Sequence, residues 1–207
     1  MFWKLIIKIE IFVLSLSLIA CEYKMDENHQ ELYDAFIVKN YLKAEQLIKE
    51  KNLDVNKLKD TNNHTLLMMT SWNKKYDEAF YILIKNGADV NAAEFTYQNR
   101  IENAYAKFVS EDNRSTLQFA VNGGDEKKIR TLIEKGAEVN WMSRLGRTAL
   151  SDAIYMGNRN ATRTLLELGA DPFQKIKKRK ITAYDLIKEK GWTEILKYID
   201  EKQKYSH

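Results

Sequence analysis

The stretch that decides the fold is Gly146-Arg147-Thr148-Ala149-Leu150-Ser151-Asp152-Ala153. Its Leu150 and Ala153 stand 33 residues after Leu117 and Ala120, which hold the same places in an earlier copy. Further copies begin at Leu32, Leu67 and Tyr184. A second apolar segment follows each copy, and three of these segments are followed by the pair Gly-Ala, at Gly87, Gly136 and Gly169. The chain is therefore built largely from a repeated unit of about 33 residues.

The spacing of apolar residues predicts what each unit is. Leu117, Ala120 and Val121 are three and four residues apart, which places them on one face of a helix. A second helix is predicted around Ile129 to Ile133 for the same reason. Each unit is expected to be a pair of antiparallel helices followed by a loop.

The eight glycines support this interpretation. Three are predicted to follow second helices, three to lie between paired helices, and Gly146 to lie in the turn before a first helix. Only Gly123 has no predicted role. No glycine is left for a loop that cradles a phosphate group.

This unit is similar to the ankyrin repeat, and residues 146–153 resemble the family line Gly-x-Thr-Pro-Leu-His-x-Ala. The resemblance implies an all-α fold, an ankyrin-repeat solenoid of about five helix-turn-helix repeats, over residues 30–203. The repeats are expected at 30–58, 59–92, 111–141, 142–174 and 175–203, with a tail at 204–207. The family proline is replaced by Leu66, Thr116, Ala149 and Ala183. The family histidine is replaced by Met68, Gln118, Ser151 and Asp185, so its hydrogen bonds between neighbouring loops are expected to be missing.

An insertion is predicted at about 93–110, between repeats two and three. Val90 and Val139 are 49 residues apart where one repeat would place them 33 apart. The extra residues are rich in aromatic side chains, namely Phe95, Tyr97, Tyr105 and Phe108. Insertions in repeat proteins collect on one face, which is often the binding face. Two interpretations remain open: these aromatic side chains pack on the stack, or they contact a partner.

The first residues resemble a bacterial lipoprotein signal peptide. Lys4 and Lys8 precede the apolar run from Ile11 to Ala20, whose ten residues would span only about 15 Å as a helix. The run ends in the lipobox-like Leu18-Ile19-Ala20-Cys21. The resemblance implies that residues 1–20 are removed, that Cys21 is acylated, and that 21–29 form a tether. An uncleaved anchor helix, or a simple signal peptide cut after Ala20, are the alternatives.

Two loop tips are predicted as contact sites. Trp141, Met142 and Arg144 form the more suggestive tip, because tryptophan and arginine are enriched where binding energy concentrates. The alternative is that Trp141 packs on a neighbouring loop. A basic tip comprises Lys175, Lys177, Lys178, Arg179 and Lys180, which would touch acidic groups or form a solvated loop. Trp72, at the end of a first helix, is expected to be partly buried.

Composition excludes several functional classes. A net charge of +4, from 33 basic and 29 acidic residues, is too small to indicate nucleic-acid binding. The three histidines, with His29 in the predicted tether, lack metal-ligand spacing. No nucleophile or dinucleotide motif occurs, so we expect neither an enzyme nor a cofactor.

The expected function is therefore protein binding in the cell envelope. The protein would be a monomer, held on a membrane by the lipid on Cys21, and would bind an unidentified protein through its concave face and loop tips. An immunity protein is one form of this function. The alternatives are a surface-displayed effector or adhesin that binds host proteins, and an accessory subunit of an envelope enzyme. Glu22 after the cysteine favours the outer membrane where a cell has two.

Overall fold

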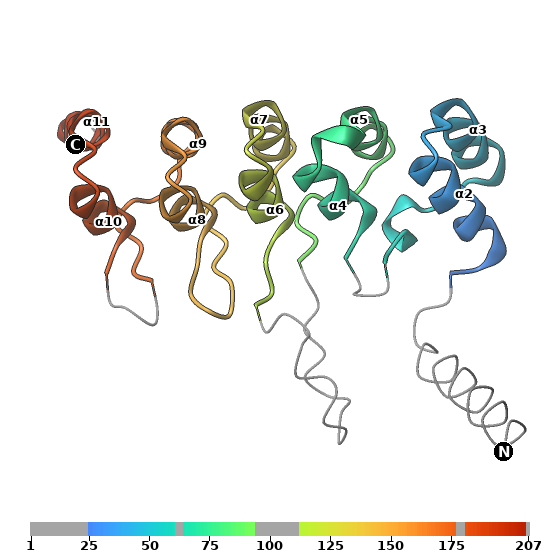
Figure 1. The fold of residues 1–207 in the computed structure, drawn as a ribbon, viewed down its shortest axis with the longest axis horizontal. Helices are drawn as coiled ribbons and strands as arrows, with labels where there is room; N and C mark the ends of the chain where they lie inside the picture. The colour runs from blue at the N-terminus through green and yellow to red at the C-terminus, as the bar shows by residue number, and fades with distance from the viewer. Residues whose placement is uncertain (1–24, 61–63, 94–111, 177–180, 206–207) are drawn as a thin grey trace, which may run out of the picture.

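The computed structural model describes residues 25–60, 64–93, 112–176 and 181–205, which contain ten α-helices in five antiparallel pairs (Figure 1). The pairs are α2 (Glu27–Ile37) with α3 (Tyr41–Lys51), α4 (Leu66–Trp72) with α5 (Asp77–Lys85), α6 (Thr116–Gly123) with α7 (Glu126–Glu134), α8 (Ala149–Tyr155) with α9 (Arg159–Glu167), and α10 (Ala183–Glu189) with α11 (Thr193–Lys204). Two short 3-10 helices, η1 (Val55–Lys57) and η2 (Lys74–Tyr76), precede α4 and α5. The predicted all-α solenoid is confirmed.

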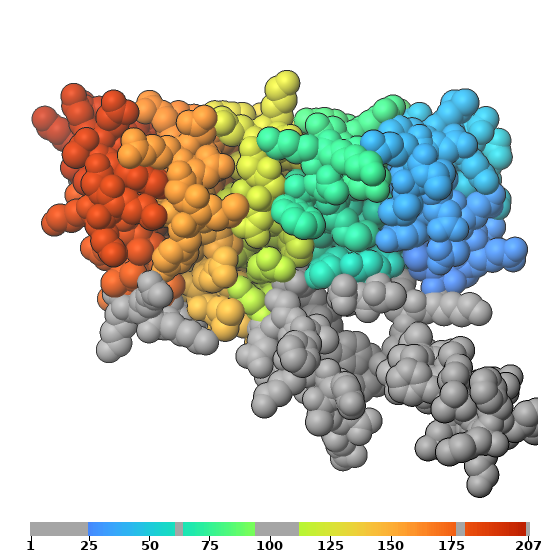
Figure 2. Space-filling model, in the orientation of Figure 1, coloured from blue at the N-terminus to red at the C-terminus, as the bar shows by residue number. Residues whose placement is uncertain are grey.

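The pairs stack side by side in chain order. In Figure 1 the first helices of the pairs form one row and the second helices form another, with the loops projecting beyond the first row. The space-filling view shows the colours following one another as bands, so each repeat lies between its sequence neighbours (Figure 2). One continuous apolar core runs through all five pairs, from Leu32 and Phe36 in α2 to Ile195 and Ile199 in α11. Each pair buries its apolar face only because a neighbour covers it.

Local chemistry explains where the helices begin. Short polar side chains accept a hydrogen bond from the first turn of most of the helices, as Thr65 does for α4 and Asn40 for α3. Ser115, Thr148 and Thr182 form reciprocal capping boxes with the residue three positions later. The seven glycines with a predicted backbone role all have positive φ angles, whereas Gly123 does not. The predicted turns are therefore confirmed.

Asparagine side chains join successive loops. Asn91 donates from Nδ2 to the carbonyl of Gly136 at 3.0 Å and accepts at Oδ1 from the backbone N–H of Glu138 at 2.8 Å. Asn56 and Asn140 make the same two contacts with the repeat that follows each of them. Each of these amides satisfies one carbonyl and one N–H of the next loop, and so fixes the spacing of the stack.

The first repeat begins earlier than its predicted start at residue 30. Helix α2 starts at Glu27 because the Asp26 carboxylate accepts a hydrogen bond from the backbone N–H of His29. His29 is buried, and its Nδ1 lies 2.6 Å from Oδ2 of Asp26. The predicted tether at 21–29 therefore overlaps the helix by three residues, and His29 belongs to the repeat domain. Within the described ranges, no helix is long and apolar enough to cross a membrane.

Candidate functional site

A groove lies along the first three repeats, on the side of the first helices. It has a volume of about 570 Å³. We call it the inner groove, and its walls are Phe36, Ile37, Asp60, His64, Leu66, Met69, Thr70, Trp72, Asn73, Tyr76, Ala79, Arg114, Phe119 and Asn122. These residues come from α2, α4, η2, α5, α6 and the loops before α4 and α6. Concave sites with mainly apolar walls are where proteins most often hold ligands.

Unequal packing of the helices opens the groove. Helix α4 packs closely on α6, whereas α2 makes few close backbone contacts with α4. Gly123 at the end of α6 allows the close approach, because a Cβ there would collide with the backbone carbonyl of Trp72 and lie 3.0 Å from the carbonyl oxygen of Ser71. The repeat pattern of the sequence predicted no role for Gly123. Its role is to permit this backbone contact, which lets α4 lie close to α6.

The side chain of Trp72 is 59% exposed, so it is more exposed than the predicted partial burial implied. Helix α4 ends at Trp72, and α6 covers the backbone of that residue rather than its ring. The indole therefore stays accessible in the wall of the groove. An exposed tryptophan beside other apolar side chains is typical of a protein contact surface.

The loop end of the groove carries a compact group of polar and aromatic side chains. Asp60 accepts a hydrogen bond from the backbone N–H of His64 at 2.8 Å, and its Oδ2 lies 3.0 Å from Nδ1 of the same histidine. The His64 ring packs edge-on against Phe119 at 5.4 Å between centroids. The Arg114 guanidinium lies 4.6 Å from the centre of the Phe119 ring. These contacts fix the shape of this end before any partner arrives.

The opposite end lies at the turns between paired helices and carries lysines. Lys39 and Lys75 place their Nζ atoms 5.5 Å and 5.7 Å from the centre of the Tyr76 ring. Lys39, Lys74 and Lys75 are exposed, as are the neighbouring Ile37 and Val38. This end of the groove therefore combines accessible apolar surface with positive charge.

Lys128 is buried behind the groove, which the sequence pattern did not indicate. The Lys128 side chain on α7 is fully buried, and its Nζ donates to the Thr70 carbonyl at 2.7 Å. The same ammonium lies 2.7 Å from Oδ1 of Asp77 and 5.4 Å from the centre of the Phe80 ring. It satisfies a carbonyl at the end of α4 and thereby fixes the helix that carries Trp72. Lys128 follows Lys127 in the sequence, and two adjacent lysines on a helix usually face solvent.

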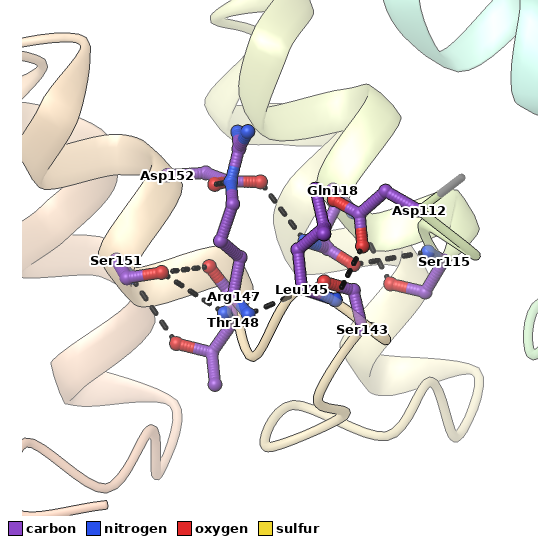
Figure 3. Close-up of polar contacts among 9 residues, drawn as sticks. All are labelled: Asp112, Ser115, Gln118, Ser143, Leu145, Arg147, Thr148, Ser151 and Asp152. Atoms are coloured by element: carbon purple, nitrogen blue, oxygen red, sulfur yellow. Dashed lines mark hydrogen bonds and ion pairs between the residues drawn. The ribbon is translucent and has the colours of Figure 1, made fainter. Parts of the chain in front are cut away.

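A second polar cluster joins repeats three and four (Figure 3). Gln118 on α6 donates from Nε2 to Oδ2 of Asp152 on α8 at 2.9 Å, and Arg147 donates from Nε to Oδ1 at 2.6 Å. Burial raises the pKa of Asp152, and the Arg147 hydrogen bond partly opposes that increase. The family histidine's hydrogen bonds between neighbouring loops were expected to be missing at Gln118, and the bond found here joins two helices instead. The glutamine amide reaches the next repeat in place of the family histidine.

The predicted tip at residues 141–144 contacts its neighbour in the stack. The Trp141 ring is partly buried, and its Nε1–H donates to the Asn113 carbonyl at 3.2 Å. The backbone N–H of Arg144 donates to Oδ1 of Asn113 at 2.7 Å. Met142 is partly buried and Arg144 is exposed. The Trp141 ring therefore contacts a neighbouring loop, as the alternative interpretation of the sequence proposed. The role of this tip in binding a partner stays a prediction.

Several predicted residues lie outside the described part of the chain. They are Cys21, the aromatic residues Phe95, Tyr97 and Tyr105, and the basic residues Lys177, Lys178, Arg179 and Lys180. Of the insertion only its first residue is described: Ala93 pairs with Ser115 in an isolated bridge. At the basic tip, Lys175 pairs with Thr182 and the neighbouring Ile176 is buried. In the described ranges, no group of three His, Cys, Asp or Glu side chains is arranged to hold a metal ion.

Comparison with known families agrees with the architecture. Residues 95–176 match the family described as ankyrin repeats in three copies. No curated protein matches the chain. Ankyrin repeats indicate a module for protein–protein interaction. The chain therefore contains ankyrin repeats, and its described helices form an ankyrin-repeat solenoid.

Proposed function

We propose that this protein is an ankyrin-repeat lipoprotein of the bacterial cell envelope that binds a partner protein through its inner groove. The observation that carries the binding role is the groove itself, with a volume of about 570 Å³ and Trp72 accessible in its wall. The groove is shaped by contacts within the stack, through Gly123, His64 and Lys128. A site formed in advance loses little conformational entropy on binding.

The membrane role is supported by the sequence from Lys4 to Cys21. If Cys21 carries lipid, residues 22–26 are all that separate it from the start of α2 at Glu27. Five extended residues span at most about 17 Å. The first repeat would therefore lie close to the membrane surface, and a partner in the inner groove would be held there too.

Three biological roles fit such a protein. They are an immunity protein that captures a toxin in the envelope, a surface-displayed effector or adhesin, and an accessory subunit of an envelope enzyme. Protease treatment of intact cells separates surface display from the other two, because only a displayed repeat domain would be cut. Glu22 favours the outer membrane in a cell with two membranes.

The binding role is tested by crosslinking in living cells that make the protein naturally. A photoreactive amino acid replaces Trp72 in the groove, and in a matched strain it replaces Gln46, which is exposed on the second helix α3. We expect one partner to be captured in near-equal amount from position 72 and not from position 46. Capture of the same species from both positions, or of none from position 72 under several growth conditions, would contradict the proposed role.

The anchor is tested separately by Cys21→Ser. The parent chain should take up a clickable palmitate analogue and fractionate with membranes, whereas C21S should do neither. Release of the anchored parent by detergent, and not by high salt, would exclude a merely electrostatic attachment. An unlabelled parent chain would remove the lipoprotein half of the proposal and leave the binding half intact.

A further inference from the structure

The charges around the inner groove are unbalanced at its turn end. Lys39, Lys74 and Lys75 are exposed there, and within the described residues none of the three forms an ion pair. Two of their ammonium groups lie over the Tyr76 ring. That contact holds the positive charge next to apolar surface without neutralising it.

The neighbouring carboxylates are largely engaged elsewhere. Asp60 in the groove wall is bonded to His64, and Asp77 is paired with the buried Lys128 at 2.7 Å. Asp125, at the next turn, accepts from the first backbone N–H groups of α7. Glu78, at the start of α5, lies near Tyr41. Asp77 and Lys128 cancel each other, so three lysines that form no ion pair within the described residues stand against the carboxylates of Glu78 and Asp125, which leaves an excess of one positive charge among these groups.

We propose that the inner groove takes an acidic peptide segment of the partner, in which bulky apolar side chains are flanked by carboxylates. This inference rests on the proposed function and names the chemistry of its partner. The apolar side chains would pack against Ile37, Met69 and Trp72 in the wall of the groove. The carboxylates would meet Lys39 and Lys75 beside the Tyr76 ring, and Lys74 next to them in η2. Complementary charge of this kind selects the partner and its orientation, while the buried apolar side chains supply most of the affinity.

The geometry favours a peptide over a membrane surface as the occupant. The apolar side chains line a recess between α2 and α4, which a segment can enter and a flat lipid surface cannot. Lys39 follows the last residue of α2, and Lys74 and Lys75 follow the last residue of α4, whereas the tether precedes the first residue of α2. Eleven helical residues separate the two ends by about 16 Å. Lys39 therefore lies about 16 Å from the end of the helix to which the tether is joined.

The experiment is a selection of random short peptides, displayed on phage, against the full-length protein in detergent. The enriched peptides are then synthesised and their affinities are measured by isothermal titration. We expect the enriched sequences to share bulky apolar residues flanked by Asp or Glu. Trp72→Ala should weaken their binding about tenfold or more. Asn122→Trp, which fills the groove from α6, should also prevent binding while leaving α4 unchanged.

The lysines are tested with charge reversal. Lys39→Glu combined with Lys75→Glu should weaken binding about tenfold at low salt, and by less as salt is added, since exposed charges are screened. Lys49→Glu makes the same kind of change at an exposed position on α3 and should alter affinity by no more than about twofold. Thermal unfolding followed by circular dichroism first shows that each variant has the same melting temperature as the parent.

Other outcomes would overturn the inference. They are a selection without enrichment, enriched peptides that are basic or lack carboxylates, and binding that Trp72→Ala does not weaken. Binding of the C21S chain to phosphatidylglycerol vesicles that depends on Lys39 and Lys75 would identify the patch as a membrane contact instead. If crosslinking from position 72 captures a partner that enters the groove with a basic segment, this inference fails and the proposed function stands. If position 72 captures nothing, both fail.

Discussion

The ammonium group of Lys128 lies 2.7 Å from the Thr70 carbonyl oxygen and 2.7 Å from a carboxylate oxygen of Asp77, although its side chain is fully buried. A buried charge is tolerated only when its hydrogen bonds are supplied by the protein. Here they come from the end of α4 and the start of α5, so a residue of repeat three fixes both helices of repeat two. The position of Trp72 in the groove depends on this contact between repeats.

Replacing Lys128 should therefore destabilise repeat two more than its neighbours. Lys128→Ala leaves the Thr70 carbonyl without its donor and opens space against Phe80, and we expect a loss of about 2–4 kcal/mol in the free energy of unfolding. Urea unfolding followed by circular dichroism measures the loss. The adjacent Lys127 is exposed, so Lys127→Ala is the matched control and should change stability by less than about 0.5 kcal/mol. Equal effects of the two variants would show that burial of Lys128 contributes little.

The asparagine contacts between loops make a second prediction. Asn91→Ala removes one donor to Gly136 and one acceptor for Glu138, so we expect a loss of about 1–3 kcal/mol. Asn160 is exposed on α9 and makes no such contact between loops, so Asn160→Ala should be near neutral. Hydrogen exchange should report where the loss occurs. Amides of repeats two and three should exchange faster in the N91A variant, and an increase spread evenly over all repeats would contradict the proposed local role.

The repeated pattern made the helix pairs predictable. Leu117, Ala120 and Val121 share a helix face, and seven glycines have the positive φ angles that their places in the repeat require. Polar residues were harder to place. The sequence pattern did not indicate that Lys128 is buried, and Gln118 was interpreted as the loss of a family hydrogen bond between loops. Neither contact could be predicted from the local pattern, because the partner of each residue belongs to a different repeat, 58 and 34 positions away.

The inner groove was not predicted for a related reason. Its width depends on how far α2 lies from α4, and periodicity within a helix contains no information on distances between helices. Two residues could have indicated the groove from the sequence. Trp72 is an aromatic residue at the end of a short helix, and Gly123 is the one glycine without a predicted role in a turn. A glycine that no turn requires often marks the close approach of another backbone.

Gly123 supplies the third prediction. In Gly123→Ala the new methyl group would meet the Trp72 carbonyl, so α4 and α6 must move apart, at a cost of about 1–3 kcal/mol. Asn122→Ala, one position earlier on the same helix, is the control and should cost less, because Asn122 lines the open groove. Thermal unfolding compares the two variants. The separation should also change the environment of Trp72, and unchanged tryptophan fluorescence in the G123A variant would show that α4 has not moved.

The fourth prediction concerns pH and Asp152. Burial raises the pKa of this carboxyl in the folded chain above its ordinary value of 3.8, so the folded state keeps the proton to a higher pH than the unfolded state does. Its contribution to stability is therefore largest below that value and falls as the pH rises through the folded pKa. Asp152→Asn cannot titrate. The free energy of unfolding of the parent minus that of D152N should decrease as the pH rises from 3.8 through the folded pKa.

A carboxylate with the opposite shift provides the control for Asp152. The hydrogen bond from Arg130 lowers the pKa of Glu167 below 4.5, so its stabilising contribution is complete above that pH and is lost as the pH falls through the folded pKa. The difference between the parent and Glu167→Gln should therefore increase as the pH rises toward about 4.5 and then stay level. Urea unfolding at several pH values measures both differences. If the D152N difference also increased with pH, the Arg147 and Gln118 contacts would outweigh the burial of Asp152, and its pKa would have to be lowered in the folded chain.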